Sequence, residues 1–575
     1  MAVGPPALSR LPGRVLVPAL AQAIRRQAVR EWTGTPMHRW LLARPRPEGL
    51  AARPKDPRPT NPEAGRRLLE GRFVFGGATL EAGVRGDPWD RPSPSRRFAA
   101  QLHRFDWMGD LLATGQAGAA EGLRLTLDWS RVFGRWNGFS WAPDVLERRT
   151  YNLACAAHRI CVGASDAEIA VIAQDLARQG RQLLSEVEGP ARAAERAVAV
   201  ALAGTALAGE AGEQLIDRGL VRLERALHQT VLPDGGHATR CPRAALELLL
   251  DLQTMDEALV QRGVAPPDEM MRAMDRLTGA VRFFTLADGC LPDLQGAEAT
   301  SRAYVAAARA SEEGAPRPPS SRNGFQRLDG GNLQDFADAA PPAQGPWSVG
   351  ACAQPLAIEV LAAGRRMIVA CAWSPEANGP QALRLADAGS TVCVGDATCG
   401  EPLRGFRSMA LGPRLLDAYR DVTAQRHQAQ GSLWLELSHD GWVPRFGLRH
   451  ERRLFLDLAA DELRGEDRLA PVAGVVEVAE GRRLVPFMVR FHVHPTVRAS
   501  LARDGKSVLL RGQGDETGWW LRNDAQEVTL ETSVYFQDGL PRRTQQVVMR
   551  GNVRLDAGAR IRWKLAAAEA WPPPQ

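Results

Sequence analysis

Several features that define common protein classes are missing from this chain of 575 residues. No stretch approaches the run of about 18 apolar residues that a membrane-spanning helix needs, so no such span is predicted. The eight cysteines include no Cys-x-x-Cys pair, which argues against a zinc ribbon or a redox motif and predicts reduced or buried thiols. No recognisable nucleic-acid module combines basic with aromatic residues, so nucleic acid is not predicted as a partner.

The N-terminus lacks a convincing signal peptide. Its apolar stretch is broken by Pro18 and no cleavage site follows, which predicts a cytoplasmic protein. The net charge of +6 comes largely from an Arg- and Pro-rich segment, so residues 1–66 are predicted to be a basic N-terminal arm. Within it, Val15 to Trp32 is amphipathic, and a docking helix is favoured over a lipid-facing one.

The chain is too long for one hydrophobic core, and two or more domains are expected. After a short hairpin over Gly71 to Trp89, apolar residues recur at helical spacing. The predicted helices are Asp144 to Val162, Asp166 to Val187, Ala191 to Leu207, Glu213 to Val231, Arg243 to Arg262 and Asp268 to Leu286. Helices joined by short turns form antiparallel hairpins, and residues 67–313 are therefore predicted to form an α/α toroid.

The second half of the chain changes to a period of two. Residues 314–345 are rich in Pro and Gly and are predicted to be a linker or lid. Beyond them, "SLWLELSHDGW", "RRLFLDL" and "MVRFHVHP" alternate apolar with polar residues, and a hairpin is expected at Asp538-Gly539. Residues 346–568 are thus predicted to form an antiparallel β-sandwich, followed by a tail at 569–575. The fold class is multidomain α plus β.

Six motifs in order give the chain a family resemblance. They are "LPDGGHATRCP" at 232–242, "ADGCLPDLQGAE" at 287–298, "SHDGWVPRFGLRHERRLFL" at 438–456, "GEDRL" at 465–469, "VRFHVHPTV" at 489–497 and "SVYFQDGLPRRTQQVV" at 533–548. With them the chain resembles the heparinase II/III family from about Gly71 onward. The resemblance implies a helical toroid with a β-sandwich, and a lyase that cleaves uronate-containing acidic polysaccharide by β-elimination without a metal or organic cofactor. It also makes a periplasmic location the alternative to a cytoplasmic one.

The chain departs from the family pattern in three places. The tyrosine expected two residues beyond the proline of the first motif is replaced by Ala244, which cannot transfer a proton. The Asn-His pair expected on an earlier helix is missing, because residues 161–208 contain neither amino acid. A histidine expected early in the β-domain is replaced near Gly389. These losses argue against the usual lyase mechanism.

Four residues are predicted to carry any remaining catalysis. His237 and Arg240 follow the Asp-Gly-Gly turn and could neutralise a sugar carboxylate and bind a glycan oxygen, or Arg240 could simply pair with a nearby acid. Tyr151 or His439 would move protons, although a tyrosine titrates near 10 and needs a strong perturbation. A surface histidine is the alternative for His439.

A second group is predicted to bind substrate: Arg149, Asn152, Trp136, Trp141 and His450. Sugar rings stack on exposed indoles, but large aromatics more often fill a core. Because adjacent residues of one helix point apart, at most two of Arg149, Tyr151 and Asn152 can serve one cleft. His492 and His494 alternate on a strand and could chelate a metal, but no third ligand is identified, so no metal site is predicted.

Three functions follow as hypotheses. The first is a heparinase II/III-like lyase acting on an acidic polysaccharide. The second is a catalytically degenerate protein that binds glycan or associates with the cell envelope through the same cleft. The third is a scaffold whose basic arm docks a partner.

Overall fold

A computed structural model describes residues 13–568, with gaps at 187–188, 311, 313–317, 377–379, 406–407, 409–410, 430, 476–482 and 516. The predicted tail at 569–575 and the first twelve residues of the predicted arm lie outside the described residues. The chain divides into two compact units that alternate along the sequence. Unit 1 takes in the chain up to Pro233, Leu246–Thr278 and Ala307–Ser311; unit 2 takes in Asp234–Ala245, Gly279–Ala306 and the chain from Glu312 onward.

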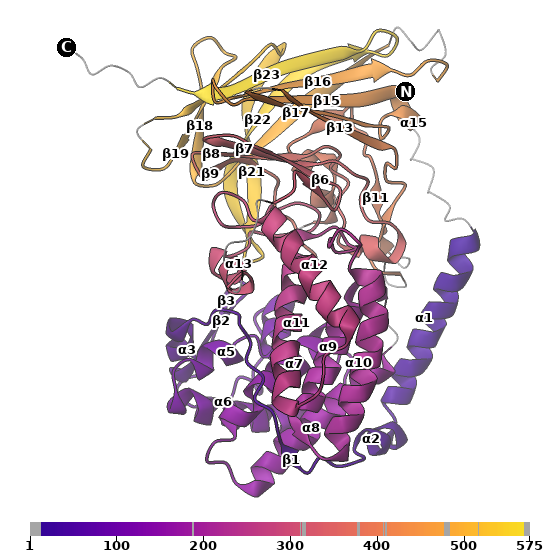
Figure 1. The fold of residues 1–575 in the computed structure, drawn as a ribbon, viewed down its shortest axis with the longest axis vertical. Helices are drawn as coiled ribbons and strands as arrows, with labels where there is room; N and C mark the ends of the chain where they lie inside the picture. The colour runs from indigo at the N-terminus through magenta and orange to yellow at the C-terminus, as the bar shows by residue number, and fades with distance from the viewer. Residues whose placement is uncertain are drawn as a thin grey trace, which may run out of the picture. The chain divides into compact units, whose positions relative to one another are not determined.

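Unit 1 is mainly helical (Figure 1). Its helices are α1 (Gly13–Thr33), α2 (Pro36–Leu42), α3 (Pro62–Leu69), α4 (Arg96–Arg104), α5 (Met108–Leu112), α6 (Gln116–Phe133), α7 (Pro143–Ile160), α8 (Asp166–Ser185), α9 (Ala193–Thr205) and α10 (Glu210–Thr230). Two short pairs accompany them, β1 (Gly49–Leu50) with β4 (Leu207–Ala208) and β2 (Arg72–Phe75) with β3 (Ala78–Glu81). The helices α11 (Pro242–Arg262), α12 (Asp268–Phe284) and α13 (Arg302–Ala308) have residues in both units.

The helical periodicity predicted these elements well. All six predicted helices are present, with ends shifted by three residues or fewer, and the β2–β3 hairpin lies within the predicted one. Ser165 and Glu168 form a capping box at the start of α8, because each side chain accepts from the other's backbone N–H. At the centre of unit 1, α9 is buried along almost its whole length and packs against α7, α8 and α10. A Cβ at Gly219 of α10 would lie 2.7 Å from the backbone N of Ala201, so this close crossing requires glycine.

The predicted arm contains α1, α2 and α3 among its described residues. The helix α1 spans the amphipathic stretch Val15 to Trp32 that was predicted to be helical. Asn61 caps α3 by accepting from two backbone N–H groups, and Pro62 stands at its first position. None of the described helices combines the length and the apolar character that a membrane crossing requires.

Unit 2 contains two antiparallel sheets. In the nine-stranded sheet the order is β21 (Glu527–Gln537), β22 (Leu540–Arg554), β17 (Leu484–Val493), β9 (Arg365–Val369), β8 (Ile358–Ala362), β7 (Leu333–Asp338), β6 (Phe325–Asp329) and β5 (Ser321–Arg322), with β10 (Val392–Val394) also paired to β17. In the eight-stranded sheet it is β13 (Val422–Ala429), β14 (Ser432–His439), β15 (Leu448–Asp457), β16 (Glu462–Pro471), β23 (Ala559–Ala567), β20 (Trp519–Asn523), β19 (Val508–Gly512) and β18 (Val497–Leu501). The short pair β11 (Glu401–Pro402) and β12 (Leu415–Leu416) and the helical turn α15 (Val443–Phe446) complete the unit.

One apolar core joins the two sheets into a sandwich. It combines Leu435, Leu454 and Leu463 of the eight-stranded sheet with Val360 and Val489 of the nine-stranded sheet. The alternation therefore predicted the buried faces correctly. Two details differ: β15 ends at Asp457, which leaves Leu458 exposed, and residues 321–338 are strands of the sheet. The segment 314–345 is thus not a linker, because its residues Phe325, Leu328 and Leu333 are fully buried.

The predicted hairpin at Asp538-Gly539 is confirmed. It joins β21 to β22, and both turn residues have positive φ, 52° and 66°. This is the backbone that a two-residue Asp-Gly turn favours.

Candidate functional site

The Asp-Gly-Gly turn lies in unit 2 and is held by the segment before β6. The Asp234 carboxylate accepts from the backbone N–H of Gly236 at 2.9 Å and of Asn323 at 2.6 Å. Gly235 has φ 85°, and a Cβ at Gly236 would lie 2.2 Å from Asn323 Cγ. Both glycines are therefore required by the turn itself, independently of any ligand.

His237 is fully buried at the end of this turn. Its Nδ1 accepts from the backbone N–H of Thr239 at 3.2 Å and lies 2.7 Å from the Thr239 hydroxyl. Because Nδ1 is an acceptor, a neutral ring carries its hydrogen on Nε2. The ring also makes an edge contact with Trp347, at a centroid distance of 6.3 Å. A donor at Nε2 suits neutralisation of a carboxylate better than removal of a proton.

Arg240 pairs with an acid and with backbone carbonyls of its own unit. Its guanidinium donates to the Asp338 carboxylate at 2.6 Å and stands 4.6 Å from the Phe325 ring centroid. It also donates to the carbonyls of Asn323, Gly324, Ala340 and Pro341. These five bonds use all five N–H groups of an arginine, so none is left for a ligand. The alternative prediction, a pair with a nearby acid, describes what is observed.

Tyr419 is a buried tyrosine that the sequence analysis did not identify. It follows β12, and its hydroxyl has no hydrogen-bond partner among the described residues. Burial raises its pKa well above the ordinary value. Its ring lies 5.5 Å from that of His439, so a tyrosine and a histidine do meet in unit 2. No sequence motif marked this tyrosine.

His439 and His450 form a buried chain with Asp467. Gly441 N–H donates to His439 Nδ1 at 3.0 Å, so a neutral His439 must donate from Nε2 to His450 Nδ1 at 3.1 Å. His450 Nε2 in turn donates to Asp467 at 2.9 Å. Burial lowers the pKa of both histidines.

Arg452 also pairs with Asp467 and stabilises the negative charge of that carboxylate. It donates to both oxygens of Asp467, at 2.6 and 3.1 Å, and to two backbone carbonyls. Burial alone would raise the pKa of Asp467, but Arg452 and His450 lower it well below the ordinary value. The structure thus places His439 and His450 inside the sandwich, where both are fully buried, and their predicted roles in catalysis and substrate binding stay predictions.

The side chains predicted from α7 point to different parts of unit 1. Arg149 is fully buried, stands 4.2 Å from the Trp129 ring and donates to Gln179, and burial lowers its pKa to about 9. Tyr151 points elsewhere, donating to Thr254 at 2.7 Å. Burial and Asp56 raise the pKa of Tyr151 well above its ordinary value, which keeps its hydroxyl protonated and so unable to accept a proton as a phenolate.

The adjacent Arg148 belongs to a buried cluster of charged residues around Asp251. It and Arg58 both pair with the buried Asp251, at 2.8 and 2.6 Å, and Arg148 also stands 4.2 Å from the Tyr151 ring. Tyr151 is locked in this cluster, since Arg58 donates to its hydroxyl at 3.0 Å. Neither Arg149 nor Tyr151 is exposed, and their predicted roles in substrate binding and proton transfer stay predictions.

The remaining predicted residues have different surroundings. Trp141 is buried and donates to the Phe133 carbonyl at 2.8 Å, as the alternative of a packing role predicts. Trp136 and Asn152 are half-buried, and Asn152 donates to the Arg104 carbonyl at 2.9 Å. Their predicted contact with substrate stays a prediction.

The described residues offer no cluster of three His, Cys, Asp or Glu that could hold a metal ion. His492 and His494 have different partners and do not point toward a shared metal position. Its Nδ1 lies 2.7 Å from the Ser533 hydroxyl and its Nε2 3.0 Å from the Asp387 carbonyl, whereas His494 packs on Tyr535.

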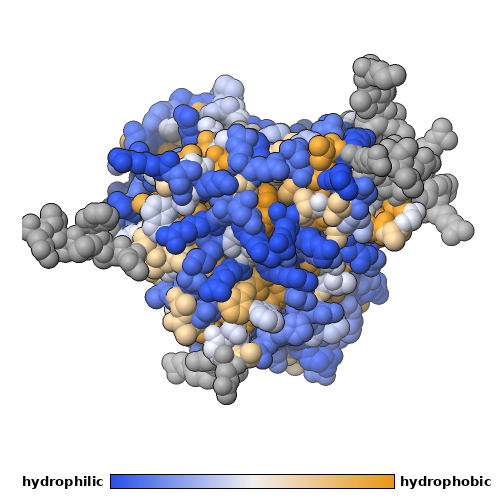
Figure 2. Space-filling view, turned by 90° about the horizontal axis from the view of Figure 1, so that it is seen from above, coloured by the Kyte–Doolittle hydropathy of each residue, from blue (hydrophilic) through white to orange (hydrophobic). Residues whose placement is uncertain are grey.

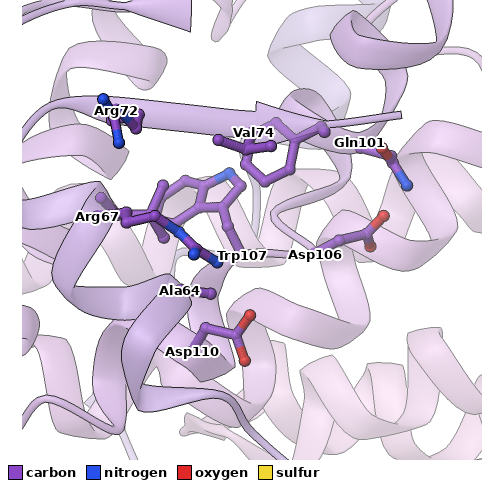
Figure 3. A pocket seen from close by; sticks show the side chains of 10 residues that line it. Ala64, Arg67, Arg72, Val74, Gln101, Asp106, Trp107 and Asp110 are labelled. Carbon is purple, nitrogen blue, oxygen red and sulfur yellow. The ribbon is translucent and has the colours of Figure 1, made fainter. Parts of the chain in front are cut away.

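A small cavity of about 150 Å³ lies in unit 1 (Figure 3). Arg67, Trp107 and Asp110 line it, and the Asp110 carboxylate accepts from the Asn61 backbone at 2.6 Å. Burial raises the pKa of Asp110. Pockets for small molecules usually measure roughly 300–1,000 Å³, so this cavity is too small for a saccharide unit.

Comparison with known proteins gives three findings. The model of the heparinase II/III-like C-terminal family matches residues 314–564. The chain is 52% identical over 577 residues to FtsZ-localized protein C of Caulobacter vibrioides, covering 99% of this chain and all of that protein. The crystal structure of a heparinase III matches with a TM-score of 0.65 at 14% identity, covering 88% of this chain and 84% of that one.

A heparan sulfate lyase from Pedobacter heparinus matches with a TM-score of 0.54 at 15% identity, over 97% of this chain and 91% of the other. At such identities these structural matches establish the fold alone. They confirm the predicted toroid followed by a β-sandwich.

Proposed function

Since residues 314–564 match the heparinase II/III-like C-terminal family and the whole chain is 52% identical to FtsZ-localized protein C, we propose that the chain keeps the lyase fold without the usual lyase chemistry and works as an FtsZ-associated protein. The observation that carries this proposal is the 52% identity to FtsZ-localized protein C along the whole of both chains. An identity of this extent includes both units, and so the surfaces that a shared partner would recognise.

The surroundings of the lyase-like residues support the same proposal. Ala244 replaces the expected tyrosine, Arg240 has no free N–H group, and Tyr151 is locked by Arg58 and Thr254. A general base must reach the proton that it removes, within about 3 Å or through one water. Buried side chains that stabilise the fold do not meet that need.

The location is proposed with the function. We propose a cytoplasmic protein and keep the periplasm as the alternative that the lyase resemblance implies.

Binding to FtsZ tests the proposal directly. The purified full chain is titrated against immobilised FtsZ from the same organism, and a fluorescent fusion is imaged together with labelled FtsZ in cells. We expect saturable binding and coincident localisation. A fusion that spreads independently of FtsZ, with no binding of the purified protein, would refute the proposal.

The lyase is the second candidate, favoured by one observation in unit 2. His237 is held with its hydrogen on Nε2, and Tyr419 and His439 lie side by side. If these residues act, heparan sulfate, chondroitin sulfate or another uronate polymer would yield an unsaturated sugar that absorbs in the near ultraviolet. His237→Ala and Tyr419→Phe would each abolish that product. No product from any polymer would exclude this candidate.

A further inference from the structure

The outer face of the eight-stranded sheet contains a pocket of about 840 Å³. We call it the outer-face pocket. It is lined by Trp434, Leu435, Glu436, Arg453, Leu454, Phe455, Arg464, Gly465, Glu466, Arg522, Asn523, Asp524, Arg562, Trp563 and Lys564. Figure 2 looks down on the part of unit 2 where β15, β16 and β23 lie uppermost in Figure 1, and apolar residues show there among hydrophilic ones. The volume is within the range of ligand sites, roughly 300–1,000 Å³.

One row of side chains crosses this pocket from apolar to basic. Trp434, Phe455, Arg464, Lys564 and Arg522 stand in register on five neighbouring strands, β14, β15, β16, β23 and β20. Neighbouring strands are about 4.8 Å apart, so the row is about 19 Å long. It presents two rings at one end and three cations in succession at the other.

The aromatic end is open to solvent. Trp434 is 50% exposed, although it is a large apolar side chain. Its ring centroid lies 5.5 Å from that of Phe455, with the planes tilted by 58°. Two tilted rings form an angle that can hold one apolar side chain, rather than a flat platform for a sugar ring.

The basic end has unbalanced charge. The lining holds five cations and three carboxylates, an excess of two positive charges. Arg464 and Lys564 share Glu462 beside the pocket, at 2.9 and 2.8 Å. Arg522 is exposed, and the carboxylate that it influences, Asp504, is not part of the lining. An anionic group would complement this end.

The chemistry of the lining distinguishes a peptide from a saccharide. Sugar hydroxyls are usually recognised by precisely placed neutral and charged hydrogen-bonding groups, whereas the only neutral polar side chain here is Asn523, whose amide already donates to the Lys506 carbonyl. Carboxylates, by contrast, pair well with guanidinium groups. A ligand with acidic groups and one large apolar group fits both ends of the row.

We propose that the outer-face pocket docks an acidic peptide segment of a partner protein. One large apolar side chain of the segment lies against Trp434 and Phe455, and its carboxylates contact Arg464, Lys564 and Arg522. This inference goes beyond the proposed function, because association with FtsZ specifies no surface and the segment can belong to any partner.

The test uses the full chain and labelled synthetic peptides in fluorescence anisotropy. The probe is a short Asp- and Glu-rich peptide with one central leucine, compared with a peptide whose leucine is replaced by serine and with one whose acids are replaced by amides. We expect only the acidic leucine peptide to bind well. Arg464→Glu combined with Arg522→Glu should weaken it by about tenfold or more, and Trp434→Ala should remove the preference for leucine over serine.

A matched control is available on the same sheet. Arg498 and Arg511 are exposed and face each other across β18 and β19, outside the pocket. Arg498→Glu combined with Arg511→Glu makes the same change in net charge and should leave peptide binding unchanged. Circular dichroism confirms that each variant is folded.

Three results would overturn the proposal: no binding of the acidic leucine peptide, equal weakening by the control pair, or displacement of the peptide by a neutral oligosaccharide. FtsZ binding is measured with the same variants. If the wild-type chain does not bind FtsZ, the proposed function is refuted. The proposal for the outer-face pocket is tested separately, by the peptide titration.

Discussion

The inner and outer faces of β14, β15 and β16 use similar side chains in opposite ways. On the inner face, Arg452 and Asp467 are buried with His439 and His450, and their polar groups are tied into one network. On the outer face, the neighbouring Arg453 is exposed and forms loose pairs with Glu436 and Glu466, at 3.4 and 3.8 Å. One step along a strand therefore separates a structural ion pair from a surface that can meet a ligand.

This difference explains why residue type alone did not identify the site. From the sequence alone, a histidine or arginine on the inner face cannot be told from one on the outer face. Burial makes loss of one partner costly on the inner face, whereas solvent screens the outer pairs. The comparison predicts large stability effects inside and small ones outside.

The largest effect is expected from Asp467→Asn. It leaves the Arg452 guanidinium buried without its counter-charge and replaces one of the two oxygens that accept from His450 and Trp563 by an NH2 donor. Breaking a buried pair in this way costs about 3–5 kcal/mol. Urea unfolding of the full chain measures the free energy, and a loss below 1 kcal/mol would contradict the structural role assigned to the network.

Asp335→Asn should act in the opposite direction and depend on pH. Asp335 is fully buried on β7, both carboxylate oxygens lack a partner among the described residues, and burial raises its pKa to about 7 despite Arg452. Between pH 4 and 7, roughly, the folded chain holds a proton that the unfolded chain has released, so stability falls as pH rises through that window.

Asparagine does not titrate, so this slope should disappear in the variant. At pH 8 we expect a gain of about 2 kcal/mol, because the burial of an unpaired carboxylate is removed. Urea unfolding at a series of pH values measures it. Parallel profiles for the variant and the parent would show that Asp335 is not the titrating group.

Tyr419→Phe is expected to have a smaller effect, a gain of about 1 kcal/mol. It removes a buried hydroxyl that has no partner among the described residues and keeps the ring beside His439. Thermal unfolding measures the change. A substantial loss of stability would mean that the hydroxyl is bonded in solution, and would strengthen the case for a role in chemistry.

The smallest effect is expected from Glu466→Gln, the matched control for Asp467→Asn. It lies one residue away on β16, faces outward and pairs with exposed arginines. Such pairs contribute about 0–1 kcal/mol, and salt should reduce even that. A loss as large as that of Asp467→Asn would remove the distinction between the two faces.

Much of the fold could be predicted from the sequence, because burial imposes its period locally. The apolar spacing found α7 to α12 and the inward residues of β14 and β17. The segment 314–345 was misread because its many Pro and Gly residues hid three buried apolar positions at Phe325, Leu328 and Leu333.

The site was harder to predict, because it depends on neighbours that are distant in sequence. On α7, Arg148 pairs with Asp251, whereas the predicted Arg149 reaches Gln179. Nothing local distinguishes these adjacent arginines.

The outer-face row could have been found in part. Trp434 and Phe455 occupy outward positions of two predicted strands, where an apolar residue is unexpected. Their alignment with Arg464, Lys564 and Arg522 needed the register of five strands, and this follows only from the structure.

The alternation of the two units along the chain determines how the protein can be divided. A fragment that begins at residue 314, where the family match starts, would leave behind Asp234–Ala245 and Gly279–Ala306 of unit 2. It would keep Asp338 without Arg240, and Arg366 without its Asp293 partner. Fragments cut at that point should therefore misfold. Circular permutation, or insertion of both missing segments, offers a sounder way to isolate the sandwich.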